Sequence, residues 1–235
     1  MSAWAARRFW TDATVRAEAG GHAVMLDARP VRTPLKEPLI LPTEDLAQEI
    51  AAEWQAQGDV VDPATMPFTR TANSAIDTVT PHLQTVAAQI SAYGGSDLLC
   101  YRATGPQALI LRQAQAWDPL LEWAVRDLDA PLVQTFGIMP VAQPQDSLAA
   151  LAARVGALGP FHLAAFHDLV ALSGSLLLGL AVSAGRITAP EAWGLSRLDE
   201  DWQADQWGAD EEAAAVAALK RQAFLTADRF FALCG

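Results

Sequence analysis

The feature that most constrains the fold of this chain is a change of hydrophobic pattern near residue 43. Before that point, short apolar runs alternate with turn residues every few positions, which is typical of strands. Gly20-Gly21 separates residues 15–19 from 22–26, and paired glycines readily adopt the positive φ angles of a tight hairpin. We therefore expect a small antiparallel unit, with further short strands at 31–33 and 39–41 after a turn at 27–30.

After residue 43, apolar side chains recur at helical spacing. Leu46, Ile50 and Trp54 follow one another at intervals of four, with Thr43 ahead of them as a cap. Further along, Asp118-Pro119 interrupts a helical period, and because proline inside a helix costs about 3 kcal/mol we expect a new helix capped by Asp118. The sequence therefore predicts helices at both places.

The last third of the chain carries two further helix-start signals. Thr188-Ala189-Pro190-Glu191 has the spacing of a capping box and predicts a helix that continues to about Trp207. Asp210 is placed to cap a final helix. The expected inner face of that final helix consists of Ala213, Val216, Ala217, Phe224, Ala227 and Phe231.

Together these patterns predict an α+β fold with a small antiparallel β-rich N-terminal domain followed by a larger all-helical domain. We place the first domain at residues 1–62, including one helix near 44–57, and the second at 63–235. A chain of 235 residues of which 51% are hydrophobic is long and apolar enough to bury a sizeable core.

Composition restricts the classes of partner. The 16 Lys and Arg residues against 27 Asp and Glu give a net charge of −11, which argues against nucleic acid and anionic lipid. The longest uncharged stretch, residues 169–185, is interrupted by Ser and Gly and is shorter than the roughly 20 apolar residues of a membrane span. No export signal is visible, and two distant cysteines are typical of an intracellular protein. We expect neither nucleic-acid binding nor membrane insertion.

No residue pattern indicates catalysis, a metal or a cofactor. His162 and His167 are five residues apart, so on a helix they diverge instead of sharing a ligand. The glycine-bearing segments lack the spacing of phosphate-binding loops. Asp199 and Glu200 are adjacent, and adjacent helical side chains point about 100° apart. Catalysis is therefore the weaker interpretation of these residues.

The most informative segment, residues 198–212, is acidic and aromatic and contains no Lys or Arg. At helical spacing Glu200 lies between the indoles of Trp193 and Trp207, with Ser196 and Gln203 on the same face. Two interpretations stay open at this point. The tryptophans are either core residues beneath a solvated acidic face, or part of an exposed surface for a partner.

Seven segments of the sequence form a recognisable series. They are Leu26-Asp27-Ala28-Arg29-Pro30-Val31-Arg32-Thr33-Pro34, Glu53-Trp54, Met66-Pro67-Phe68-Thr69-Arg70-Thr71-Ala72-Asn73-Ser74-Ala75-Ile76-Asp77, Ser96-Asp97-Leu98-Leu99-Cys100-Tyr101-Arg102-Ala103, Trp117-Asp118-Pro119-Leu120-Leu121, Ser173-Gly174-Ser175-Leu176, and Asp199-Glu200-Asp201-Trp202-Gln203 with Trp207-Gly208. In this order the segments resemble the Atp12 family, the assembly chaperones of the F1 part of ATP synthase. One departure is Ala28, where the family pattern usually has Gly.

The resemblance implies a non-enzymatic chaperone without a cofactor that binds the unassembled F1 α subunit until the α subunit pairs with β. We expect a bacterial cytoplasmic location, or the mitochondrial matrix for a processed eukaryotic form. We expect the chaperone itself to be a monomer. The residues expected to bind the partner are Glu200, Asp199, Trp202, Gln203, Trp207, Trp117 and Asp118.

Two alternative functions stay open from the sequence. One is a metal-dependent hydrolase that uses the Asp and Glu cluster, and the other is a permanent scaffold subunit of the finished complex.

Overall fold

The structure, a computed structural model, describes residues 7–208 and 210–235. The chain forms two compact units. Unit 1 contains the chain up to Leu83 together with 159–165 and 229–235, and unit 2 contains 84–158 and 166–228. The helices α6 (Pro160–Ser173) and α10 (Glu211–Leu233) each contribute residues to both units. Each compact unit joins segments that are distant in sequence. The division into two domains at residue 62 stays a prediction.

Unit 1 contains a four-stranded antiparallel sheet in which β2 pairs with every other strand. The predicted hairpin is confirmed, with Val15 opposite Val24 and with Gly20 and Gly21 at φ +90° and +152°. A Cβ atom on Gly21 would lie 2.2 Å from the carbonyl oxygen of Leu41, so only glycine fits there. The strands are β1 (Ala13–Glu18), β2 (Gly21–Leu26), β3 (Arg29–Pro30) and β4 (Ile40–Leu41).

The turn between β2 and β3 explains how the chain tolerates alanine where the family pattern has glycine. Asp27 takes the positive φ, +52°, and Asp27 is a residue type that tolerates this conformation. Its carboxylate accepts hydrogen bonds from the backbone N–H groups of Thr11 and Asp12, both at 3.0 Å. The turn is therefore fixed by Asp27, and Ala28 need not adopt a left-handed conformation.

Helices cover the sheet and complete the core of unit 1. The predicted helix after Thr43 is confirmed as α1 (Glu44–Gln55), and the Thr43 hydroxyl accepts a hydrogen bond from the N–H of Leu46 at 3.3 Å. Leu46 and Ile50 are fully buried in the same core as Val24 of β2. The remaining elements that begin in unit 1 are η1 (Pro63–Thr65), α2 (Pro67–Ser74), the π-helical η2 (Ala75–Val79), η3 (Thr80–His82) and α3 (Leu83–Ser91).

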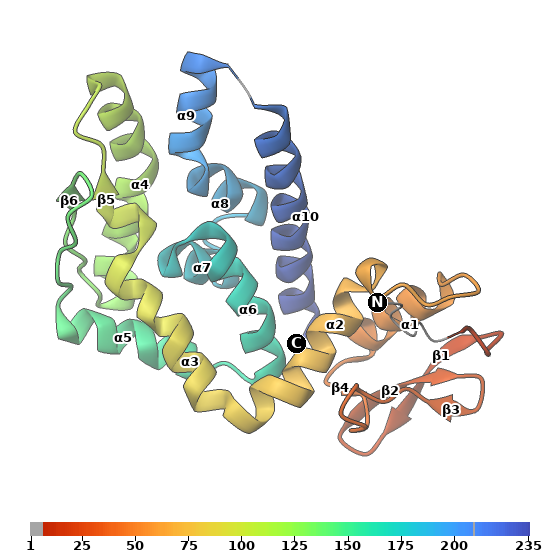
Figure 1. Ribbon diagram of the computed structural model, residues 1–235. Helices are drawn as coiled ribbons and strands as arrows, with labels where there is room; N and C mark the ends of the chain where they lie inside the picture. Colours follow the sequence, from red (N-terminus) through yellow and green to blue (C-terminus); the bar gives the residue numbers. More distant parts are fainter. Residues whose placement is uncertain (1–6, 209) are drawn as a thin grey trace. The chain divides into compact units, whose positions relative to one another are not determined.

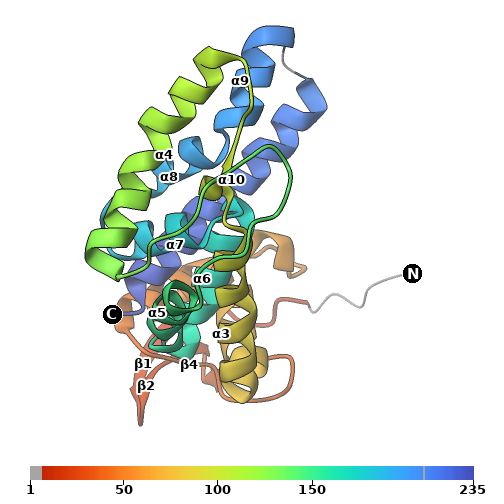
Figure 2. The same cartoon turned by 90° about the vertical axis from the view of Figure 1, so that its left-hand side faces the viewer.

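Unit 2 is mostly helical, so the chain has the α+β fold expected of it (Figure 1). One two-residue parallel pairing interrupts the helices, where Tyr101 and Arg102 pair with Thr135 and Phe136. Figure 2 shows the long connection between α4 and α5 that carries the second of these strands. The elements are η4 (Ala92–Ser96), η5 (Leu98–Cys100), β5 (Tyr101–Arg102), α4 (Gln107–Leu128), β6 (Thr135–Phe136), α5 (Gln145–Gly156), α7 (Leu176–Ser183), α8 (Ala189–Ser196) and α9 (Leu198–Trp207), together with parts of α6 and α10.

The prediction of a new helix at Asp118-Pro119 is wrong, because α4 continues through Pro119 without a break. Buried side chains on both sides of the proline, Trp117 and Leu120 among them, hold the helix against the core of unit 2. The Asp118 carboxylate is also engaged elsewhere, since it accepts a hydrogen bond from Arg102 at 2.7 Å. Packing therefore overrides the local cost of the proline.

The segment predicted as one helix from Thr188 to about Trp207 forms two helices, α8 and α9. The capping box is confirmed, with the N–H of Thr188 donating to Glu191 at 2.8 Å and the N–H of Glu191 donating to the Thr188 hydroxyl at 3.4 Å. These bonds lower the pKa of Glu191. The break falls at Arg197, where φ is −107° and ψ is 7°. Ser196 donates to the carbonyl of Trp193 at 2.8 Å and so engages a carbonyl in the last turn of α8.

The predicted inner face of α10 is only half right. Phe224 and Ala227 are buried, but Val216 is 46% exposed and Ala213 is also exposed. Asp210 does cap the helix, accepting from the N–H of Ala213 at 2.8 Å. Alanine-rich sequence has high helix propensity, so these first turns remain helical with little packing on them. No helix among the described residues is long and apolar enough to cross a membrane.

Candidate functional site

Helix α9 carries five of the seven expected partner-binding residues, and one side of it is fixed to α4. The Asp199 carboxylate accepts a hydrogen bond from Gln113 Nε2 at 2.7 Å, and Gln113 Oε1 accepts from the N–H of Ala103 at 2.8 Å. Gln113 is almost fully buried, so this link is sheltered from water. On the same side, the guanidinium of Arg112 lies 6.0 Å from the Trp202 ring centroid. Asp199 and Trp202 therefore help to hold α9 in place.

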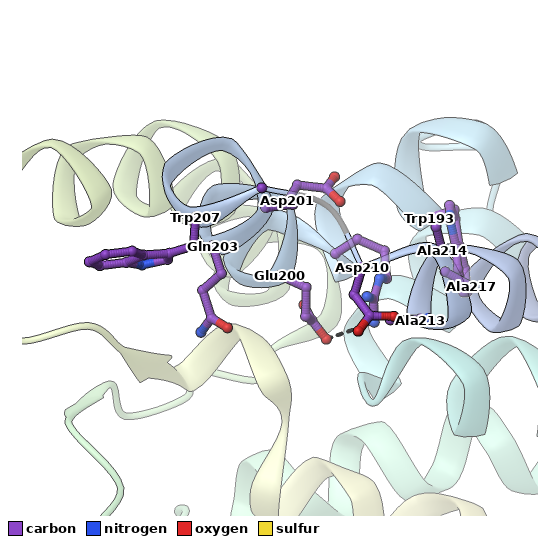
Figure 3. A pocket seen from close by; sticks show the side chains of 12 residues that line it. Trp193, Glu200, Asp201, Gln203, Trp207, Asp210, Ala213, Ala214 and Ala217 are labelled. Atoms are coloured by element: carbon purple, nitrogen blue, oxygen red, sulfur yellow. Dashed lines mark hydrogen bonds and ion pairs between the residues drawn. The ribbon is translucent and has the colours of Figure 1, made fainter.

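The other side of α9 faces a pocket of about 600 Å³ between α9 and α10, which we call the α9–α10 pocket (Figure 3). Glu200 and Gln203 line it from α9, and so does Trp207, whose side chain projects from the end of that helix and is 89% exposed. Trp193 of α8 also lines it and is buried against Phe224, with ring centroids 5.8 Å apart. The wall from α10 consists of Ala213, Ala214 and Ala217.

The α9–α10 pocket is acidic. Glu200, Asp201 and Asp210 line it against one arginine, Arg197, which gives a formal charge of 1 − 3 = −2. Arg197 is paired with Glu200 at 2.7 Å, and the Asp210 carboxylate caps α10. The Asp201 carboxylate has neither a hydrogen bond nor an ion pair within the described part of the chain. The pocket therefore combines an exposed indole with carboxylates able to accept further hydrogen bonds.

The last two expected partner-binding residues, Trp117 and Asp118, lie in α4 and do not line this pocket. Trp117 is fully buried, and its Nε1–H donates to the carbonyl of Leu195 at 3.0 Å. Asp118 pairs with the buried Arg102, whose guanidinium also lies 5.3 Å from the Trp117 ring centroid. These residues join α4 to β5 and to the end of α8, and so support α8, which contributes Trp193 to the pocket.

A second internal link joins residues 96–103 to residues 173–176, two of the seven segments that carry the family resemblance. The Asp97 carboxylate is fully buried and accepts hydrogen bonds from the Ser175 hydroxyl at 2.7 Å and from the N–H of Leu177 at 2.9 Å. It also accepts from the N–H of Leu99 at 3.0 Å. Burial raises the pKa of Asp97 above its ordinary value. Ser175 is the N-cap of α7, so Asp97 fixes the start of that helix.

Among the described residues, no group of three or more His, Cys, Asp or Glu side chains is arranged to hold a metal ion. His167 lies 3.0 Å from Asp168, and this hydrogen bond raises its pKa. His162 packs edge-on against Phe231 at 4.7 Å, and burial lowers its pKa. Both cysteines are buried free thiols, and burial raises the pKa of each to about 12.

Sequence reasoning did not identify the α10 wall of the pocket or the two carboxylates at Asp201 and Asp210. The wall consists of Ala213, Ala214 and Ala217, which are small enough to fit a core, and two of them were expected on the buried inner face of α10. A signal that the first turn of α10 is exposed is the absence of any large apolar residue at 210–215, since a buried helical turn normally supplies one.

Comparison with known proteins places this arrangement in a family. The family model described as "ATP12 chaperone protein" matches residues 7–125. The mitochondrial protein atp12 of Schizosaccharomyces pombe is 24% identical over 219 residues, which cover 88% of this chain and 75% of that protein. The crystal structure of Atp12 from Paracoccus denitrificans is 55% identical with a TM-score of 0.95, covering 98% of this chain and 99% of that one. A point mutant of P. denitrificans Atp12p is 54% identical with a TM-score of 0.96 over 100% of both chains. The chain therefore belongs to the ATP12 chaperone family.

Proposed function

We propose that this chaperone assists assembly of the F1 sector of ATP synthase and binds the unassembled α subunit at the α9–α10 pocket. Family membership supports the general role. The observation that supports the location is Trp207, which is 89% exposed beside a carboxylate-lined pocket. Exposed tryptophan is frequent among the residues that dominate binding energy in protein interfaces. We expect the protein to act in the bacterial cytoplasm.

The chemistry of the pocket suits a temporary contact. A subunit that awaits its partner exposes a large apolar surface, and such surfaces aggregate unless they are covered. The chaperone must cover that surface and later release it. Acidic side chains around an aromatic contact accelerate encounter with a basic surface and select the partner, while contributing less to the final affinity than the aromatic contact itself.

The proposed contact residues are Glu200, Gln203 and Trp207, joined by Asp201 and Asp210. Asp199, Trp202 and Asp118 act as positioning residues, because their side chains bond or pack against α4 or β5. The proposal leaves Trp117 out of the contact surface, because its side chain is fully buried.

Replacing Glu200 by Gln tests the proposal. Glu200 is exposed and its partner Arg197 is partly exposed, and ion pairs that water reaches contribute about 0–1 kcal/mol, so the melting temperature should change little. Binding of the purified α subunit should weaken several-fold, because the variant loses a charge in the contact. Glu122→Gln, on the exposed face of α4, serves as the matched control and should bind normally.

Two results would count against the proposal. A large drop in melting temperature for Glu200→Gln would indicate a structural role for Glu200. Recovery of the protein at fixed stoichiometry in finished ATP synthase would instead indicate a permanent scaffold, because an assembly chaperone leaves the complex.

A further inference from the structure

The α9–α10 pocket offers an occupant side chains but few free backbone groups. Its two long walls are helices, and the backbone groups within a helix already bond to each other. Two of the helix-end N–H groups near the pocket are bonded as well. The N–H of Gly208 donates to the carbonyl of Ala204 at 2.9 Å, and the N–H of Ala213 donates to Asp210.

This property decides which backbone conformation can enter. An extended segment seated between two helices would lose its hydrogen bonds to water and find no strand edge to pair with. A helical segment satisfies its own backbone and presents only side chains. The pocket therefore favours a helix over an extended strand.

The residues of the α10 wall determine how closely such a helix can approach. Ala204 of α9 lines the pocket opposite Ala213, Ala214 and Ala217 of α10, and small residues allow two helices to pack at short range. The α10 wall runs from Asp210 to Ala217, which corresponds to about 10 Å at 1.5 Å per residue. Contact with about two turns of a helix fills that length.

Charge determines what surrounds the apolar face of the occupant. The pocket carries a formal charge of −2, and the Asp201 carboxylate has no partner among the described residues. A lysine or arginine of the occupant could satisfy it, whereas an acidic side chain would be repelled.

We infer that the α9–α10 pocket binds an amphipathic helix of the client, with an apolar face of about two turns flanked by lysine or arginine. The apolar face packs on the alanines of α10 and on the exposed indole of Trp207. The basic side chains contact Glu200 and Asp201. This inference rests on the proposed function, since it specifies the part of the α subunit that the pocket takes.

A matched pair of variants of the full chain tests the inference. Ala214→Phe puts a large side chain into the pocket, whereas Ala215→Phe puts the same side chain on α10 at an exposed position that does not line it. Both positions are solvent-exposed, so both variants should keep the wild-type melting temperature. Binding of the intact α subunit should fall by roughly tenfold or more for Ala214→Phe only.

Peptides of 20 residues, tiled across the α-subunit sequence of the same organism, identify the occupant by fluorescence anisotropy. We expect the binding peptides to carry apolar residues at i, i+3, i+4 and i+7 with neighbouring Lys or Arg, and a central proline should abolish their binding.

The outcomes separate the inference from the proposed function. If wild-type protein does not bind the α subunit, the proposed function fails. Three results would instead contradict the inference of a bound helix while the proposed function stands, provided that the wild-type protein binds the α subunit. These results are equal binding by the two phenylalanine variants, no binding by any peptide, or equal binding by peptides with a central proline.

Discussion

At the scale of single residues, the residues that match the family pattern are of two kinds. Some form hydrogen bonds inside the protein, and others are exposed to solvent. Gln113 and Asp199 are 86 positions apart and hydrogen-bond to each other, and Asp97 bonds to Ser175 across 78 positions. Such pairings cannot be read from local spacing, so the sequence could not separate Asp199 from its neighbour Glu200. The exposure of Trp207 was one of two open interpretations, and only the structure distinguishes them.

Asp97 gives a prediction about stability and pH. The groups that hydrogen-bond to the Asp97 carboxylate all donate to it, so in Asp97→Asn one amide N–H must face a donor. We expect a loss of about 1–3 kcal/mol in the free energy of unfolding at pH 7. Chemical denaturation followed by circular dichroism measures this difference.

The raised pKa of Asp97 sets the sign of the pH dependence. Between its ordinary value of 3.8 and the higher folded-state value, the folded chain binds more protons than the unfolded chain. The wild-type free energy of unfolding therefore falls as pH rises through that interval and levels off above it, relative to Asp97→Asn. A difference between the two proteins that grows with rising pH would show that the folded state favours the charged carboxylate.

At the scale of elements, the start signals could be predicted from sequence, and the continuity of helices could not. Thr43, Thr188 and Asp210 each cap the helix expected of them. Pro119 fails to end α4 because buried side chains on both sides hold the helix, and α8 ends at Ser196 although the next residues, Arg197 and Leu198, are neither glycine nor proline. Local residue types govern helix ends, whereas packing between distant segments decides which interruptions persist.

The start of α2 provides a prediction at this scale, because its cap comes from another helix. Met66 has no capping side chain, and Glu53 of α1 instead accepts from the N–H groups of Phe68 and Thr69 at 2.6 and 2.7 Å. The Thr69 hydroxyl donates to the same carboxylate at 2.7 Å. We expect Glu53→Gln to lower the free energy of unfolding by about 1–2 kcal/mol.

A double-mutant cycle separates the cap from general disruption. Thr69→Val removes the hydroxyl bond but leaves the backbone bonds to Glu53, so part of the two losses should be shared. If the losses from Glu53→Gln and Thr69→Val add completely, Glu53 does not act through this hydrogen-bonded cap.

At the scale of the whole molecule, the pattern change near residue 43 predicted the α+β fold, and the acidic composition argued against nucleic acid and anionic lipid as partners. What they could not predict is that the first turns of α10 would remain exposed and form one wall of the α9–α10 pocket. Alanine is compatible with both a core and a surface, so its burial depends on where the rest of the chain packs. The proposed function depends on that exposed wall.

The most direct test is the affinity of the purified α subunit for Trp207→Ala, measured beside the melting temperature of the variant. Because the indole is 89% exposed, its removal should leave the melting temperature within a few degrees of wild type. We expect binding to weaken by roughly tenfold or more, as for a tryptophan that dominates an interface. Unchanged affinity for the α subunit would contradict a client-binding role for the α9–α10 pocket.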